Sequence, residues 1–170
     1  DNWDSLEQAR YRLCFEEFLI IQLGVLKQRF AWRQRPGRPM TVDQTLLSAF
    51  TNALPFTLTS AQQRVLREIT DDLQRPQPMS RLLQGDVGSG KTVVALAAML
   101  MAVANGMQAV MMAPTEVLAE QHYRTLTTML REIEERARDH RAMLAELVSR
   151  VRIGLLIGSL SPGQKTELRE

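Results

Sequence analysis

The sequence has almost no cysteine, and this shortage excludes any fold that disulfide bonds hold together. Cys14 is the only cysteine in 170 residues, so no disulfide can form within the chain. Its apolar neighbours Leu13, Phe15 and Phe18 predict a buried and inert thiol. A reducing, intracellular setting is therefore expected.

Long apolar runs and a charge imbalance are missing as well. The apolar residues 18–21 are bordered by Glu16, Glu17 and Gln22, and this run is far shorter than the about 18 apolar residues that span a bilayer. Since the chain also has no signal-peptide pattern, we expect no membrane association and a cytoplasmic location. The 21 basic and 19 acidic residues leave a net charge of +2, which neither favours nor excludes a nucleic-acid partner.

The sequence does contain a contiguous phosphate-binding pattern. Residues 85–92 match the P-loop pattern G-x-x-x-x-G-K-[ST] at every fixed position. The apolar end of residues 79–84 predicts a buried strand before the pattern, and the apolar residues 93–104 predict a buried helix after it. The candidate nucleotide-binding residues are Gly85, Asp86, Val87, Gly88, Ser89, Gly90, Lys91 and Thr92.

These residue types suit a nucleoside triphosphate that is bound together with Mg²⁺. The three glycines permit backbone conformations in which successive N–H groups point at phosphate oxygens. Lys91 would place its ammonium on the β and γ phosphates, and Thr92 would ligate the magnesium ion, so these two are the candidate catalytic residues. The alternative is a glycine-rich turn between a strand and a helix, with a solvated lysine.

Helices are expected on both sides of the P-loop. Capping boxes predict helices that begin at Ser5, Thr41, Thr59 and Ser161, the first ending near residue 29 and the second near residue 52. Thr115 is expected to cap a helix that runs through residue 130. The charged residues 131–141 predict a further, solvated helix that could form a hairpin with residues 142–150, with Glu134 and Arg138 placed for ion pairing.

Two further strands are expected, over residues 108–113 and 151–157. Because parallel strands joined by a helix form a right-handed unit, the alternation predicts an α/β fold with a parallel sheet flanked by helices. Residues 1–52 are expected to be a helical linker, and residues 53–170 a nucleotide-binding lobe.

The ends of the chain favour an excised segment of a longer protein. The chain starts at Asp1 without a methionine, and it stops at Glu170 within a newly started helix. No convincing candidate is found for the acidic strand end, the Walker B motif, that holds magnesium and activates water. We therefore expect this chain to bind nucleotide without hydrolysing it.

Three strings together resemble the RecG-type ATP-dependent DNA helicases of superfamily 2. Residues 81–92 look like the P-loop of this family, residues 54–62 are similar to its adenine-recognition motif, and residues 112–122 look like helicase motif Ia. The resemblance implies a RecA-like lobe that binds ATP and Mg²⁺, truncated before the Walker B motif. It also implies that the full protein remodels branched DNA, such as replication forks and Holliday junctions, in recombination and repair.

The resemblance also implies roles for residues outside the P-loop. Phe56 would stack on adenine and Gln62 would pair with its edge, although Gln62 could serve only as a capping partner and Phe56 only as core. The candidate DNA-binding residues, which would meet the phosphate backbone where strands end, are Pro114, Thr115, Glu116, Gly158 and Ser159. Ile157 stands where the family commonly has threonine, which puts a hydroxyl contact there in doubt.

Partners implied by the resemblance are branched or duplex DNA and the remainder of the polypeptide, with its wedge domain and second motor lobe. A monomer associated with the nucleoid is expected. Two alternatives stay open: another superfamily 2 DNA translocase, such as a transcription-repair coupling factor, and a P-loop binding domain without motor activity. The N-terminal helix favours the RecG-type family, because its residues resemble the helix that precedes the RecG motor.

Overall fold

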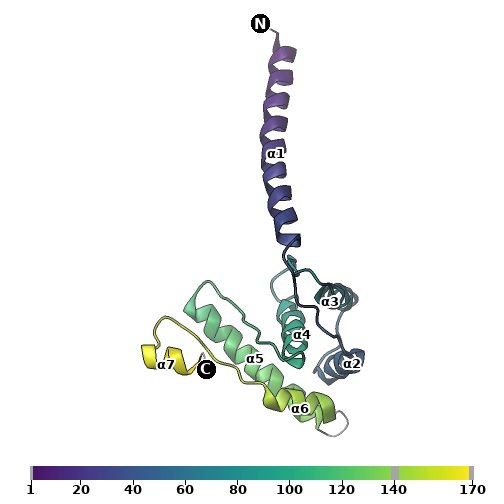
Figure 1. Ribbon diagram of the computed structural model, residues 1–170, viewed down its shortest axis with the longest axis vertical. Helices are drawn as coiled ribbons and strands as arrows, with labels where there is room; N and C mark the ends of the chain where they lie inside the picture. The colour runs from purple at the N-terminus through teal and green to yellow at the C-terminus, as the bar shows by residue number, and fades with distance from the viewer. Residues whose placement is uncertain (1, 139–141, 169–170) are drawn as a thin grey trace. The chain divides into compact units, whose positions relative to one another are not determined.

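The computed structural model describes residues 2–138 and 142–168, which carry seven helices (Figure 1). They form two compact units, one of Asp1–Pro39 with Arg75–Ser80 and the other of Met40–Gln74 with Arg81–Glu170. None of the helices in the described ranges has the length and apolar character needed to cross a membrane.

The first unit consists mainly of helix α1, Trp3–Arg33. Its N-cap is Asn2, whose side-chain oxygen accepts the Asp4 N–H at 3.2 Å, so the predicted capping box at Ser5 is wrong and the helix starts earlier. None of the residues of α1 is buried, and Cys14 is exposed, which contradicts the predicted buried thiol. Apolar neighbours in the sequence do not bury a thiol by themselves, because burial requires another element packed against the helix, and no residue of α1 is buried.

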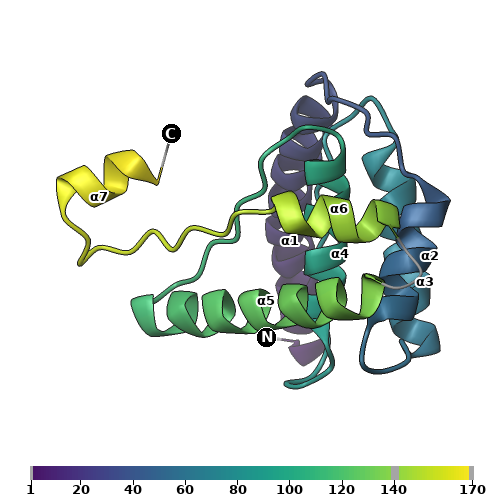
Figure 2. The same cartoon turned by 90° about the horizontal axis from the view of Figure 1, so that it is seen from below.

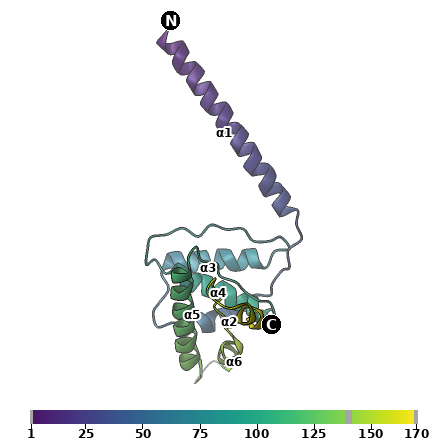
Figure 3. The same cartoon turned by 90° about the vertical axis from the view of Figure 1, so that its left-hand side faces the viewer.

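The second unit holds the other helices. They are α2 (Gln44–Ala53), α3 (Ser60–Leu73), α4 (Lys91–Ala104), α5 (Glu116–Ala137), α6 (Ala142–Arg150) and α7 (Pro162–Glu167). Helix α3 packs beside α4, and α2 packs against both α5 and α6 (Figures 2 and 3). The largest fully buried side chains of this core are Phe50, Leu100, Met101, Ile133 and Leu144.

Helix α4 is buried on most sides, as its apolar sequence predicts. It ends at Ala104, as the predicted helix over residues 93–104 does; Asn105 is its C-cap, and Gly106 follows with a φ of 69°. The side chain of Asn105 pairs with the backbone of Thr41: it accepts the Thr41 N–H at 2.8 Å and donates to the Thr41 carbonyl at 2.9 Å. The predicted cap at Thr41 is wrong, because the N-cap of α2 is Asp43, whose side chain accepts the Thr45 and Leu46 N–H groups.

The other predicted caps are confirmed. Thr59 and Gln62 form a capping box at the start of α3, and Ser161 and Gln164 form one at the start of α7. Thr115 accepts the Leu118 N–H at 3.3 Å and caps α5.

Helix α5 continues past its predicted end at residue 130 and includes most of the charged stretch. Helix α6 runs back beside it as a hairpin (Figure 2). Glu134 and Arg138 form the predicted ion pair at 3.0 Å, but Ile133 and Ala137 are fully buried, so only one face of this segment is solvated. The part of the prediction that covers residues 139–141 falls outside the described residues.

The three segments expected as strands are non-helical, and no β-strand is assigned within residues 2–138 and 142–168. The parallel sheet is therefore not confirmed. Residues 151–157 nevertheless alternate between half-buried and exposed positions, which is the two-residue period of an extended chain. Val151 and Ile153 pack against the core. In the other two segments Leu82, Val110 and Met112 are each more than four-fifths exposed.

Candidate nucleotide and nucleic-acid sites

The P-loop forms a tight turn that leads into the N-terminus of α4. Gly88 and Gly90 have φ angles of 80° and 77°, a region that side chains with a Cβ rarely adopt. The Ser89 N–H donates to the Asp86 carbonyl at 3.2 Å and closes the turn. Gly90 is the N-cap of α4, so the first N–H groups of the helix face the loop, where an anion is favoured.

The ammonium group of Lys91 lies within this loop. Its Nζ donates to the carbonyls of Gly85 at 2.9 Å and Asp86 at 2.7 Å, and to the Ser89 hydroxyl at 3.3 Å. The three N–H donors of the ammonium thus have three acceptors in the loop. A positive charge therefore lies among the P-loop atoms, beside the start of α4. Thr92 is half-buried in the first turn of that helix.

Gln62 connects helix α3 to the P-loop. Its Oε1 accepts the Thr59 N–H at 2.8 Å in the capping box, and its Nε2 donates to the Ser89 carbonyl at 2.9 Å. A Cβ at Gly90 would collide with this Nε2, so glycine at that position also leaves room for the Gln62 amide. The residue expected to read adenine thus lies against the phosphate-binding loop.

The segment that precedes the P-loop is bound to the C-terminal half of α3. Arg81 donates to Asp72 at 2.8 Å and to Glu68 at 2.6 Å, and the hydrogen bond to Asp72 is the main cause that raises the pKa of Arg81. Helix α3 therefore holds the loop near both ends, through Arg81 before it and through Gln62 at Ser89. Sequence reasoning included Arg81 only as part of a motif string and missed this role, because its partners lie 9 and 13 residues earlier.

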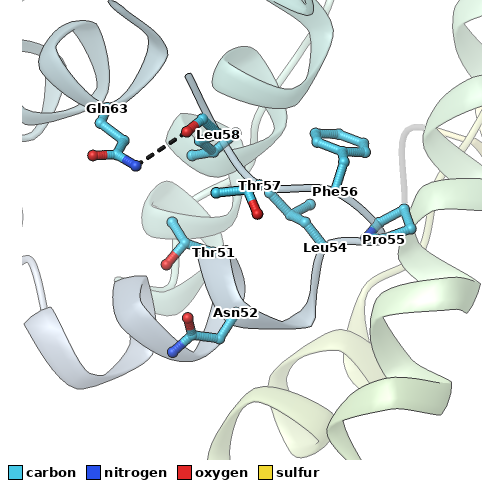
Figure 4. Close-up of a pocket in the computed structure, with 8 residues that line it drawn as sticks. All are labelled: Thr51, Asn52, Leu54, Pro55, Phe56, Thr57, Leu58 and Gln63. Atoms are coloured by element: carbon cyan, nitrogen blue, oxygen red, sulfur yellow. Dashed lines mark hydrogen bonds between the residues drawn. The ribbon is translucent and has the colours of Figure 1, made fainter. Parts of the chain in front are cut away.

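Phe56 lines an open cavity of about 350 Å³ between the end of α2 and the start of α3. Figure 4 draws the lining residues, which include Thr51, Asn52 and Gln63; the Gln63 amide donates to the Leu58 carbonyl at 3.1 Å. Phe56 is 47% exposed and does not belong to the buried core. Gln62 is not among the lining residues, so the structure does not bring the two adenine-binding candidates into one cavity.

The two segments expected to meet DNA lie next to each other. Glu116, the first residue of α5, accepts the Ser159 N–H through Oε1 at 3.1 Å, across 43 residues of sequence. Lys165 donates from Nζ to the Gly158 carbonyl at 2.8 Å. Pro114, Thr115, Gly158 and Ser159 are all exposed. Neither the Glu116 contact nor Lys165 was predicted, because each contact depends on tertiary structure.

Within the described ranges, no group of three or more His, Cys, Asp or Glu residues is placed to hold a metal ion. Of the described residues, the Thr92 hydroxyl is the one suited to a magnesium ion bound with a nucleotide, and the Walker B carboxylate expected beside it in a P-loop protein is not among them. The loop suits such a group, since its glycines, the helix N-terminus and the Lys91 ammonium all favour phosphate.

Residues 59–159, more than half of the chain, match the family described as DEAD/DEAH box helicase. The chain belongs to this helicase family. The matched range includes Gln62, the P-loop and both candidate DNA-binding segments.

Among helicases of this family the chain is similar to those named ATP-dependent DNA helicase RecG. It is 53% identical over 129 residues to the protein from Synechocystis, and this alignment covers 75% of this chain and 16% of that protein. The protein from Thermotoga maritima is 40% identical over 164 residues, with coverage of 96% of this chain and 19% of that protein. The resemblance to RecG-type helicases expected from the motifs is confirmed.

A solved structure described as RecG bound to a three-way DNA junction matches the helicase fold of this chain. The match has a TM-score of 0.75 and 38% identity, and it covers 99% of this chain and 21% of that chain. It supports a RecA-like P-loop fold. The chain spans about a fifth of the length of the relatives it matches, from 16% to 19% for the two proteins above.

Proposed function

We propose that this chain is the ATP-binding part of an ATP-dependent DNA helicase that remodels branched DNA, such as replication forks and Holliday junctions, in recombination and repair. The observation that carries the proposal is the P-loop geometry, with Lys91 inside the loop and Gln62 bonded to it, in a chain similar to RecG helicases over nearly its whole length. The full protein would be an ATP hydrolase.

In the proposed nucleotide site, the P-loop residues 85–92 bind the phosphates of ATP. The backbone N–H groups at the start of α4 donate to phosphate oxygens, and Lys91 moves its ammonium from the loop carbonyls to the β and γ phosphates. Thr92 holds Mg²⁺, which neutralises phosphate charge when bound. This role for Lys91 is supported by its position, since all its present acceptors are atoms of the same loop.

Gln62 and Phe56 are proposed to recognise adenine. The Gln62 amide keeps one N–H and one lone pair beyond its bonds to Ser89 and Thr59, and adenine offers an N7 acceptor and an N6 donor to match them. The exposed Phe56 ring is available for stacking. In this arrangement the Gln62 side chain bonds both to the adenine base and to the phosphate-binding loop.

Pro114, Thr115, Glu116, Gly158 and Ser159 are proposed to form the DNA-facing surface. Backbone N–H groups and hydroxyls are the donors that commonly meet phosphates and position a protein on a duplex. The bond between Glu116 and Ser159 supports a common surface, because it joins the two segments.

The rest of the full-length protein is proposed to supply a wedge domain, a second motor lobe and the Walker B carboxylates. Its strands would pair with residues 79–84, 108–113 and 151–157 and complete a parallel sheet, which would cover the exposed Leu82, Val110 and Met112. We propose a monomeric, cytoplasmic protein associated with the nucleoid.

The proposed domain division is a linker over residues 1–52 and a motor lobe over residues 53–170. The compact units divide between Pro39 and Met40 instead, because α2 packs on α5 and α6. As a division by function, the proposed boundary stays a prediction.

The test is ATP hydrolysis by the full-length protein with forked, linear duplex and single-stranded DNA. Stimulation that is greatest with forked DNA supports the proposal. Stimulation by an RNA polymerase partner without an effect of forked DNA would instead indicate a transcription-repair coupling translocase. ATP binding without stimulation by any DNA would indicate a P-loop binding domain.

A further inference from the structure

We propose that Glu116 is a positioning residue that holds the Gly158–Ser159 peptide group beside the Thr115 turn, so that the two segments present one surface to the DNA backbone. This inference rests on the proposed function of those segments. It assigns Glu116 to the protein side of the interface, in place of a direct contact with DNA.

The two polar groups of one peptide bond are held by two charged side chains. The N–H of Ser159 donates to Oε1 of Glu116 at 3.1 Å, and the carbonyl of Gly158 accepts from Nζ of Lys165 at 2.8 Å. Glu116 belongs to α5 and Lys165 to α7, so two helices fix the plane of this peptide from its two sides. Hydrogen bonds to charged groups are stronger and shorter than those between neutral groups.

The glycine at position 158 is explained by the same contact. A Cβ added there would lie 2.7 Å from Oε1 of Glu116, which is closer than non-bonded atoms approach. Since Gly158 has no positive φ, the requirement for glycine here is space and not backbone conformation. The small residue lets the carboxylate reach the next N–H.

Glu116 itself sits where its charge is stabilised. It is the only acidic residue in the first turn of α5, where the helix dipole favours a negative charge, and the neighbouring Thr115 caps the same helix through Leu118. The turn at Thr115 and the peptide at Ser159 are therefore connected through one short, charged side chain.

A carboxylate in this position is unsuited to meet a phosphate, because two negative charges repel each other. Donor groups are what a DNA backbone requires, and the turn offers the Thr115 and Ser159 hydroxyls and the first N–H groups of α5. Glu116 would thus contribute to DNA binding by placing donors and not by acting as one.

The first test measures ATP hydrolysis by the full-length protein against the concentration of forked DNA. Glu116→Ala removes the acceptor and is expected to raise the DNA concentration for half-maximal stimulation by about fivefold, equivalent to about 1 kcal/mol. Glu116→Gln keeps an oxygen that accepts the Ser159 N–H and is expected to stay within about twofold of the wild type. Glu120→Ala is the matched control, since Glu120 lies one turn later in α5 and forms an ion pair with the exposed Arg124 at 3.4 Å.

The second test reads the bond itself. Hydrogen exchange of the Ser159 amide in the full-length protein is expected to be faster in Glu116→Ala and unchanged in Glu116→Gln and Glu120→Ala. Gly158→Ala should push the carboxylate away and raise exchange as Glu116→Ala does, which keeps the test decisive if one variant is unstable.

Equal exchange in Glu116→Ala and the wild type would overturn the inference, as would an equal loss of DNA affinity in the Ala and Gln variants. If the wild-type protein is not stimulated by DNA at all, the proposed function fails, whereas the exchange measurement still decides whether Glu116 holds the peptide.

Discussion

At the scale of single residues, Lys91 is proposed to bind the loop in the absence of ATP and the phosphates in its presence. Its ammonium bonds to the Gly85 and Asp86 carbonyls and would exchange these neutral acceptors for phosphate oxygens, so that both partners of each bond carry a charge. Lys91→Ala is expected to weaken binding of ATP with Mg²⁺ to the full-length protein by about tenfold or more, measured by calorimetry. Lys165→Ala should leave ATP affinity unchanged. Unaltered ATP affinity in Lys91→Ala would refute the assignment of the phosphate site.

Gln62 has both a structural and a recognition role in the proposal, and the two roles predict different results. Loss of the bond to Ser89 should weaken ATP and GTP alike, whereas loss of base pairing should weaken ATP only. Gln62→Ala is therefore expected to lower the affinity for both nucleotides and also to reduce the preference for ATP over GTP, as measured by competition binding. The neighbouring Gln63→Ala is the control. An equal loss for both nucleotides would leave Gln62 with its structural role alone.

At the scale of elements, the start of α2 depends on one carboxylate. The N–H groups of Leu46 and Thr45 donate to Asp43 and lower its pKa below the usual 3.8. Because the folded-state pKa is the lower one, the stabilisation is complete above pH 3.8 and is lost as the pH falls through the folded-state value. Asp43→Asn keeps a capping oxygen without a charge. We expect the difference in Tm between wild type and Asp43→Asn to change below pH 3.8. The difference should stay constant between pH 5 and 7, which is about one to three units above the ordinary pKa of 3.8. A constant difference throughout would contradict the role of the Asp43 charge.

The caps also show which elements the sequence can predict. Thr59, Thr115 and Ser161 bond to groups three residues away, so their patterns are visible in the sequence, and the P-loop is visible because its residues are contiguous. Thr41 was wrongly predicted as a cap because Asp43, only two residues later, supplies the carboxylate that accepts the Thr45 and Leu46 N–H groups. The contacts of Glu116 with Ser159 and of Gln62 with Ser89 were missed because the partners lie 43 and 27 residues apart. The predicted strands depend on neighbouring strands for their hydrogen bonds, and a single-segment pattern does not specify those partners.

At the scale of the whole molecule, α1 differs from every other long helix in the described ranges, because none of its residues is buried. Ile20 is 70% exposed, and Phe18 and Phe30 are each 67% exposed. A helix with large apolar side chains on all sides is stable in water only when another surface covers it. In the full-length protein, of which this chain is about a fifth by comparison with relatives, we expect other segments to supply that cover.

The isolated 170-residue chain is therefore expected to self-associate through α1. Size-exclusion chromatography with light scattering should give a mass above 19.3 kDa that rises with protein concentration. The double variant Phe18→Gln, Ile20→Gln should shift the mass toward that of the monomer, because it removes two of the exposed apolar side chains. Residues 40–170, which lack α1 but keep the exposed Leu82, Val110 and Met112, are the control and should associate less than the whole chain does. A monodisperse monomer of the wild-type chain at the same concentrations would show that α1 needs no apolar cover, and the proposed burial of this helix in the full-length protein would then be wrong.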